Sequence, residues 1–140
     1  MRTARVLGIV GVVALALTLV HAGTKPADEA LRTVTVDELA ALRTVGTAVI
    51  VDANGADTRQ KYGVIPGAVL LPHYADYDVA TKLPPDRSEK LVFYCANERC
   101  MASHKAAQRA AEAGYSDESI LPAGIMGWTR AGQPTAPSGS

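Results

Sequence analysis

Continuous apolar runs, with no alternation of polar residues, constrain the fold of this chain most strongly. Residues 47–53, TAVIVDA, and residues 91–95, LVFYC, are rich in β-branched or aromatic side chains. Such runs are typical of strands that are covered on both faces, as in a parallel sheet. Shorter apolar segments at residues 68–71 and 119–122 predict two further strands.

Helical patterns lie between these runs. Thr35 and Glu38 have the spacing of a capping box, and Gly46 follows as a stop signal, so a short helix is predicted between them. The alanine-rich segment from Ser103, a candidate N-cap, to Gly114, a candidate C-cap, is amphipathic with small residues on its inner face. Strands that alternate with helices at this spacing predict a small α/β domain with a mostly parallel central sheet flanked by helices.

The N-terminal segment has the pattern of a secretory signal peptide. Arg2 and Arg5 precede an uncharged apolar run at residues 6–20, and a small-x-small cleavage pattern ends at Ala22. A retained membrane anchor is the alternative, but the run is shorter than the roughly 20 residues needed to span a bilayer. We therefore predict a signal peptide at residues 1–22, export to a periplasm or the cell exterior, and no stable membrane anchor.

The remaining chain divides into a flexible lead-in at residues 23–32, one domain at residues 33–134 and a disordered tail at residues 135–140. Of the 14 basic and 14 acidic side chains, cleavage would remove two arginines and leave 12 and 14, a net charge of −2. This balance does not indicate a nucleic-acid partner. An exported protein also lies in a compartment that permits disulfides.

Both cysteines lie where the run at residues 91–95 leads into the alanine-rich helix. Cys95 ends that strand, and Cys100 completes a C-x4-C pair. A thiol between a strand end and a helix N-terminus faces unpaired N–H groups and the positive end of the helix dipole, which favour a thiolate, a bound anion or a persulfide anion. A buried structural cysteine is the alternative. The strand predicted within residues 47–53 ends at Asp52, at the same sheet edge. There Asp52 either orients the loop or only forms a turn.

Five segments together resemble one known family, the single-domain rhodaneses, which are thiosulfate and persulfide sulfurtransferases. In order and spacing, these segments are VDAN, YGVIPGAVLLP, LPPDRSEKLVFYC, AAQRAAEAGY and LPAGIMGWTRAGQP. The resemblance covers residues 33–134 and implies a three-layer domain in which the strand-end cysteine, here Cys95, accepts sulfur. It implies a small sulfane-sulfur donor and a thiol or cyanide acceptor. Asp52 is a candidate supporting residue because of its place at a strand end. The loop expected to bind the substrate or an anion consists of Ala96, Asn97, Glu98, Arg99, Cys100 and Met101.

The sequence departs from this family at three places. Asn54 replaces the usual arginine, Val64 replaces the usual histidine, and the segment from Cys95 to the helical alanine pair is longer than in the common sulfurtransferase. In the superfamily, longer loops go with phosphate- or arsenate-sized substrates, so a donor other than thiosulfate stays open. We expect no cofactor, and His73 and His104 with the two cysteines lack a standard zinc spacing, so we expect no metal site.

Cys100 has two alternative roles. As a resolving thiol it would attack a persulfide or sulfenate on Cys95. As a disulfide staple it would stabilise by only about 2 kcal/mol, because the loop that it closes is small. Three functions stay open from the sequence: an exported sulfurtransferase, a dithiol–disulfide redox protein with a redox partner protein, and a non-catalytic binding module.

Overall fold

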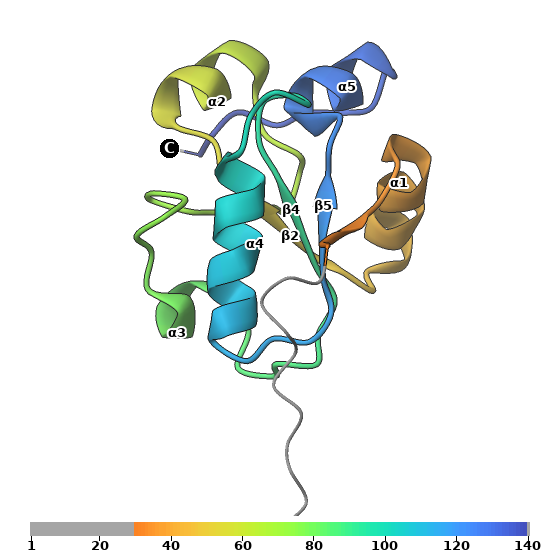
Figure 1. Ribbon diagram of the computed structural model, residues 1–140. Coiled ribbons are helices and arrows are strands. Elements are labelled where there is room, and N and C mark those ends of the chain that lie inside the picture. The colour runs from red at the N-terminus through yellow and green to blue at the C-terminus, as the bar shows by residue number, and fades with distance from the viewer. Residues whose placement is uncertain (1–29, 140) are drawn as a thin grey trace, which may run out of the picture.

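Five parallel strands form one sheet in the part of the chain that the computed structural model describes, residues 30–139 (Figure 1). The strands follow the order β1-β5-β4-β2-β3, which places β4 at the centre of the sheet. Their bounds are β1 Arg32–Thr33, β2 Val49–Asp52, β3 Val69–Leu70, β4 Leu91–Tyr94 and β5 Glu118–Leu121. The expected signal peptide and residues 23–29 of the lead-in lie outside the described residues.

Helices cover both faces of this sheet, so the domain has three layers (Figure 1). The helices are α1 Val36–Val45, α2 Ala56–Tyr62, α3 Val79–Lys82, α4 Ala102–Glu112 and α5 Gly124–Arg130. The alanine stripe of α4 packs on one face with the segment around α3, whereas α1 and α5 pack on the other face. None of the helices within residues 30–139 is long and apolar enough to cross a membrane.

The core consists of two clusters, one on each side of the sheet. Successive strand residues point to opposite faces. Phe93 therefore packs against the α4 side, and Val92 and Tyr94 pack against the α1 and α5 side. All four residues of β4 are fully buried. The continuous apolar runs of the sequence are thus explained by helices on both faces, and the predicted α/β class is confirmed.

Local capping signals predicted the start of α1 correctly but not the start of α4. Thr35 and Glu38 form the predicted capping box, and Gly46 ends α1 in the left-handed conformation. The prediction that Ser103 caps α4 is wrong, because the helix begins at Ala102 and Ser103 lies buried within its first turn. There its hydroxyl faces Cys95 instead of a free backbone N–H, so a tertiary contact replaces the local cap.

Ala136, which lies within the tail predicted to be disordered at residues 135–140, pairs with the domain. Ala136 and Val64 exchange two backbone hydrogen bonds of 2.8 and 2.9 Å. The indole Nε1 of Trp128 donates a 2.8 Å hydrogen bond to the carbonyl of Pro134. Because Trp128 is fully buried, this contact ties the segment to the domain, which the polar composition of the tail does not reveal.

Candidate functional site

The site lies at the carboxyl end of the central strand. Asp52 at the end of β2 is in register with Tyr94 at the end of β4, which is in register with Leu121 at the end of β5. Cys95 follows Tyr94 directly. The loop after it comprises residues 96–101, because Ala102 already begins α4. The extra length predicted between Cys95 and the alanine pair therefore lies partly in the first turn of the helix.

The Cys95 thiol is enclosed by its own loop and by α4. The residue is only 2% exposed. Its Sγ donates to the carbonyl oxygen of Cys100 at 3.1 Å and lies 3.4 Å from the hydroxyl oxygen of Ser103. Burial, followed by hydrogen bonding with the Cys100 side chain, raises the pKa of Cys95, although the hydroxyl and N–H of Ser103 act in the opposite direction. Cys95 is therefore a protonated thiol at neutral pH in this arrangement.

Cys100 has the opposite electrostatic character. Its side chain is partly exposed, and both cysteines are free thiols. Burial acts to raise the pKa of Cys100, but hydrogen bonds from the Cys95 side chain and from the N–H groups of Ala96 and Ala102 outweigh it and lower the pKa. The sequence predicted a thiolate at Cys95; the loop and helix N–H groups favour the anion at Cys100 instead.

The N-terminus of α5 holds the loop in place through its backbone. The N–H of Ile125 donates to the carbonyl of Cys95 at 2.9 Å, and the N–H of Met126 donates to the carbonyl of Ala96 at 3.1 Å. Gly124 has a φ of +60°, and a Cβ at this position would come within 2.5 Å of the Ala96 carbonyl. Gly124, the first glycine of the GIMGW segment, thus lets the backbone of α5 lie close to the loop. Sequence reasoning did not assign this glycine to the site.

Asp52 stabilises the carboxyl ends of the neighbouring strands β2 and β4. Its carboxylate is fully buried and accepts hydrogen bonds from the Tyr94 hydroxyl at 2.7 Å and from the Asn54 N–H at 2.6 Å. It therefore forms the turn that the sequence suggested and also anchors the residue that precedes Cys95. No hydrogen bond from Asp52 to residues 96–101 is seen within the described part of the chain.

Arg59 is a supporting residue that sequence reasoning missed. Its guanidinium donates to the carbonyl oxygens of Asp52 and Leu71 at 3.0 and 2.9 Å, and its Nε lies 3.5 Å from the Asp52 carboxylate. Arg59 lies in α2, which follows β2, and it binds the carboxyl ends of β2 and β3. No local sequence pattern indicates this contact, because an arginine in such a segment is typical of an exposed helix surface.

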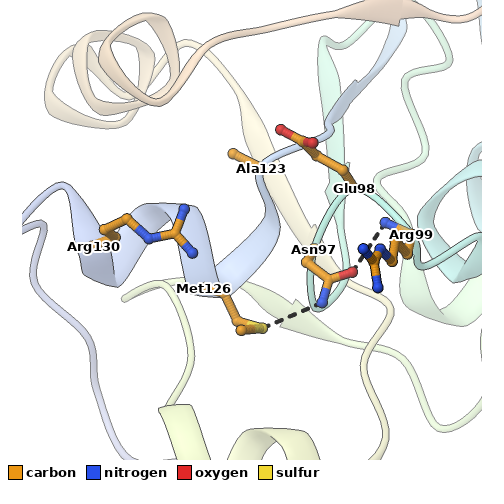
Figure 2. A pocket seen from close by; sticks show the side chains of 6 residues that line it. All are labelled: Asn97, Glu98, Arg99, Ala123, Met126 and Arg130. Atoms are coloured by element: carbon orange, nitrogen blue, oxygen red, sulfur yellow. Dashed lines mark hydrogen bonds between the residues drawn. The ribbon is translucent and has the colours of Figure 1, made fainter.

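The side chains of the predicted substrate loop divide between two sides. On the outer side is a pocket of about 230 Å³ (Figure 2), lined by Asn97, Glu98, Arg99, Ala123, Met126 and Arg130. Asn97 accepts from the N–H of Arg99 at 3.0 Å and donates to the sulfur of Met126 at 3.3 Å. The two cysteines do not line this pocket, so the charged side chains of the loop and its thiols face different spaces.

No group of three or more potential metal-ligating His, Cys, Asp or Glu side chains exists among residues 30–139. The site offers two cysteines in contact through the Cys95 Sγ and the Cys100 carbonyl, one enclosed and one partly exposed, with hydroxyl and N–H donors at the start of α4. Such a site suits nucleophilic sulfur chemistry.

Comparison with known families gives one match. The model of the rhodanese-like domain matches residues 35–131. No curated protein is similar enough to count as a relative.

Solved structures share the fold. A protein of unknown function from Rhodopseudomonas palustris, named a possible tyrosine phosphatase, has a TM-score of 0.61 and 26% identity, over 79% of this chain and 88% of its own. A human single-domain sulfurtransferase has a TM-score of 0.57 and 23% identity, over 72% of this chain and 97% of its own. A thiosulfate sulfurtransferase from Pseudomonas aeruginosa has a TM-score of 0.55 and 26% identity, over 74% of this chain but 20% of its own.

Proposed function

Because the chain belongs to the rhodanese-like domain family, we propose that it is an exported sulfurtransferase that carries sulfane sulfur as a persulfide on Cys95. The observation that carries the proposal is the position of this thiol. It lies directly after the central strand, enclosed by the loop and the first turn of α4. Export rests on the signal-peptide pattern of residues 1–22.

The surroundings of Cys95 suit a persulfide. Ser103 offers its hydroxyl and its N–H to sulfur at this position, and both groups favour the anionic form. When an acceptor thiolate or cyanide attacks the outer sulfur, the S–S bond breaks and Cys95 leaves as a thiolate, so no external oxidant or reductant is required.

The charge around the thiols favours sulfur transfer over phosphate-ester hydrolysis. Thiol, hydroxyl and backbone groups shift the two cysteine pKa values, and no arginine or lysine of the described chain is among them. Arg99 of the loop lines the outer pocket instead. A phosphoryl group carries more negative charge than a persulfide and needs cationic partners in its transition state.

The contact between the two thiols favours one second function. The Cys95 Sγ donates to the Cys100 carbonyl at 3.1 Å, and each cysteine side chain shifts the pKa of the other, so the two residues are in direct contact. A dithiol–disulfide redox protein would use this pair without sulfane sulfur, and a partner protein would reduce it again.

Intact mass spectrometry separates these functions. After incubation of the reduced protein with thiosulfate or glutathione persulfide, a persulfide adds about 32 Da and a disulfide removes about 2 Da. We expect the gain in the wild type, located on Cys95 by fragmentation, and no added sulfur at position 95 in Cys95→Ser, which keeps a side chain of similar size. Loss of 2 Da without any gain would favour the redox function. An unchanged mass with both donors would contradict both.

A further inference from the structure

We propose that sulfane sulfur first binds to Cys100 and passes from there to Cys95. This rests on the proposed function, because it assigns the route by which the Cys95 persulfide forms. It also changes the role of the second cysteine from a resolving thiol or a staple to the first acceptor.

Accessibility distinguishes the two thiols. Attack on a donor requires its sulfur to approach the thiolate in line, at about 3–3.5 Å. Cys95 is 2% exposed, and its Sγ is flanked by the Cys100 carbonyl and the Ser103 hydroxyl. Cys100 is partly exposed, and the next residue, Met101, is 54% exposed. A donor in solution therefore meets Cys100 first.

Ionisation points the same way. The Cys95 side chain and the N–H groups of Ala96 and Ala102 lower the pKa of Cys100. The Cys95 thiol donates to the Cys100 carbonyl, an arrangement that only the protonated form can make. The accessible thiol is thus also the one that is more readily available as a nucleophile.

The first step loads Cys100. Its thiolate attacks the outer sulfur of thiosulfate, a bond forms between the two sulfur atoms, and the S–S bond of the donor breaks to release sulfite. A thiolate and a dianion become a persulfide anion and a dianion, so charge and electrons balance. With an organic persulfide the leaving group is the thiolate of the donor.

The second step moves the sulfur inward. Cys95 attacks the outer sulfur of the Cys100 persulfide, the Cys100 S–S bond breaks, and its proton passes to the departing Cys100 sulfur. The 3.1 Å contact between the Cys95 Sγ and the Cys100 carbonyl holds the two residues together for both transfers. A thiol of lower pKa leaves faster, so the lowered pKa of Cys100 favours its departure in this step.

Rapid acid quench followed by fragmentation mass spectrometry tests the route. Reduced wild-type protein is mixed with excess thiosulfate, and in a second series with glutathione persulfide, and the added 32 Da is located at each time. We expect the added sulfur on Cys100 first and on Cys95 later. In Cys100→Ser and Cys100→Ala alike, loading of Cys95 should slow at least tenfold, whereas Cys95→Ser should still load Cys100.

Sulfur that appears on Cys95 first in the wild type would overturn the route, as would loading of Cys95 at an unchanged rate in both Cys100 variants. Neither result would affect the proposed function, since Cys95 would still carry the persulfide. Absence of added sulfur from every cysteine of the wild type would instead overturn the proposed function and the route together. The wild-type time course needs no substitution, so the test holds even if a variant fails to fold.

Discussion

Replacing Gly124 by alanine tests how α5 positions the active-site loop. Gly124 has a φ of +60°, a conformation that costs an L-residue with a side chain about 1–2 kcal/mol. The added Cβ would come within 2.5 Å of the Ala96 carbonyl carbon and oxygen and 2.6 Å of the Cys95 carbonyl oxygen. Overpacking of this kind costs about 1–3 kcal/mol, so the total loss is about 2–5 kcal/mol of unfolding free energy.

Gly46→Ala is a matched control for this experiment. Gly46 has a φ of +73°, but a Cβ there meets no atom within 4 Å, so only the backbone cost of about 1–2 kcal/mol applies. Urea unfolding measures the loss of unfolding free energy in both variants. The difference between the two losses is the cost of the close contact between the added Cβ and the loop carbonyls. We also expect slower persulfide loading in Gly124→Ala alone, because the carbonyls of Cys95 and Ala96 are bound by α5. Equal stability losses and equal loading in the two variants would refute this reasoning.

Three other predictions follow from the site and the N-terminus. Tyr94→Phe removes a buried hydrogen bond to Asp52, and we expect urea unfolding to show a loss of about 1–3 kcal/mol; an unchanged midpoint would contradict it. Because the pKa of Cys100 is lowered and that of Cys95 is raised, iodoacetamide should modify Cys100 first, and its rate should fall only when the pH drops through that lowered pKa. Preferential modification of Cys95 would count against this. N-terminal sequencing of the expressed protein should start at Gly23, whereas full-length chain in the membrane fraction would disprove cleavage.

The fold was predictable from the sequence because its signals are local. Continuous apolar runs reflect strands covered on both faces, and the capping box of Thr35 and Glu38 forms within one turn of helix. The apolar run of residues 91–95 also placed Cys95 at a strand end, and the family resemblance added its expected role as sulfur acceptor. These features depend on residues that lie close together in the chain.

The details of the site were less predictable because they depend on contacts between distant segments. Ser103 has the composition of a helix cap, yet its burial against Cys95 gives it another partner. Arg59 binds the ends of two strands, and Gly124 allows α5 to reach the loop, although neither residue is near Cys95 in the chain. The pKa order of the two cysteines likewise depends on which N–H groups the folded loop directs at each sulfur.

The measurement that tests the central claim most directly is the location of sulfur on the wild-type protein after it has reacted with a sulfane-sulfur donor. Reduced protein is incubated with thiosulfate or glutathione persulfide, freed of donor, and fragmented in the mass spectrometer. We predict a stable gain of about 32 Da on Cys95, which disappears when cyanide is added and thiocyanate forms. A protein whose Cys95 carries no added sulfur with either donor would contradict the claim that it is a sulfurtransferase.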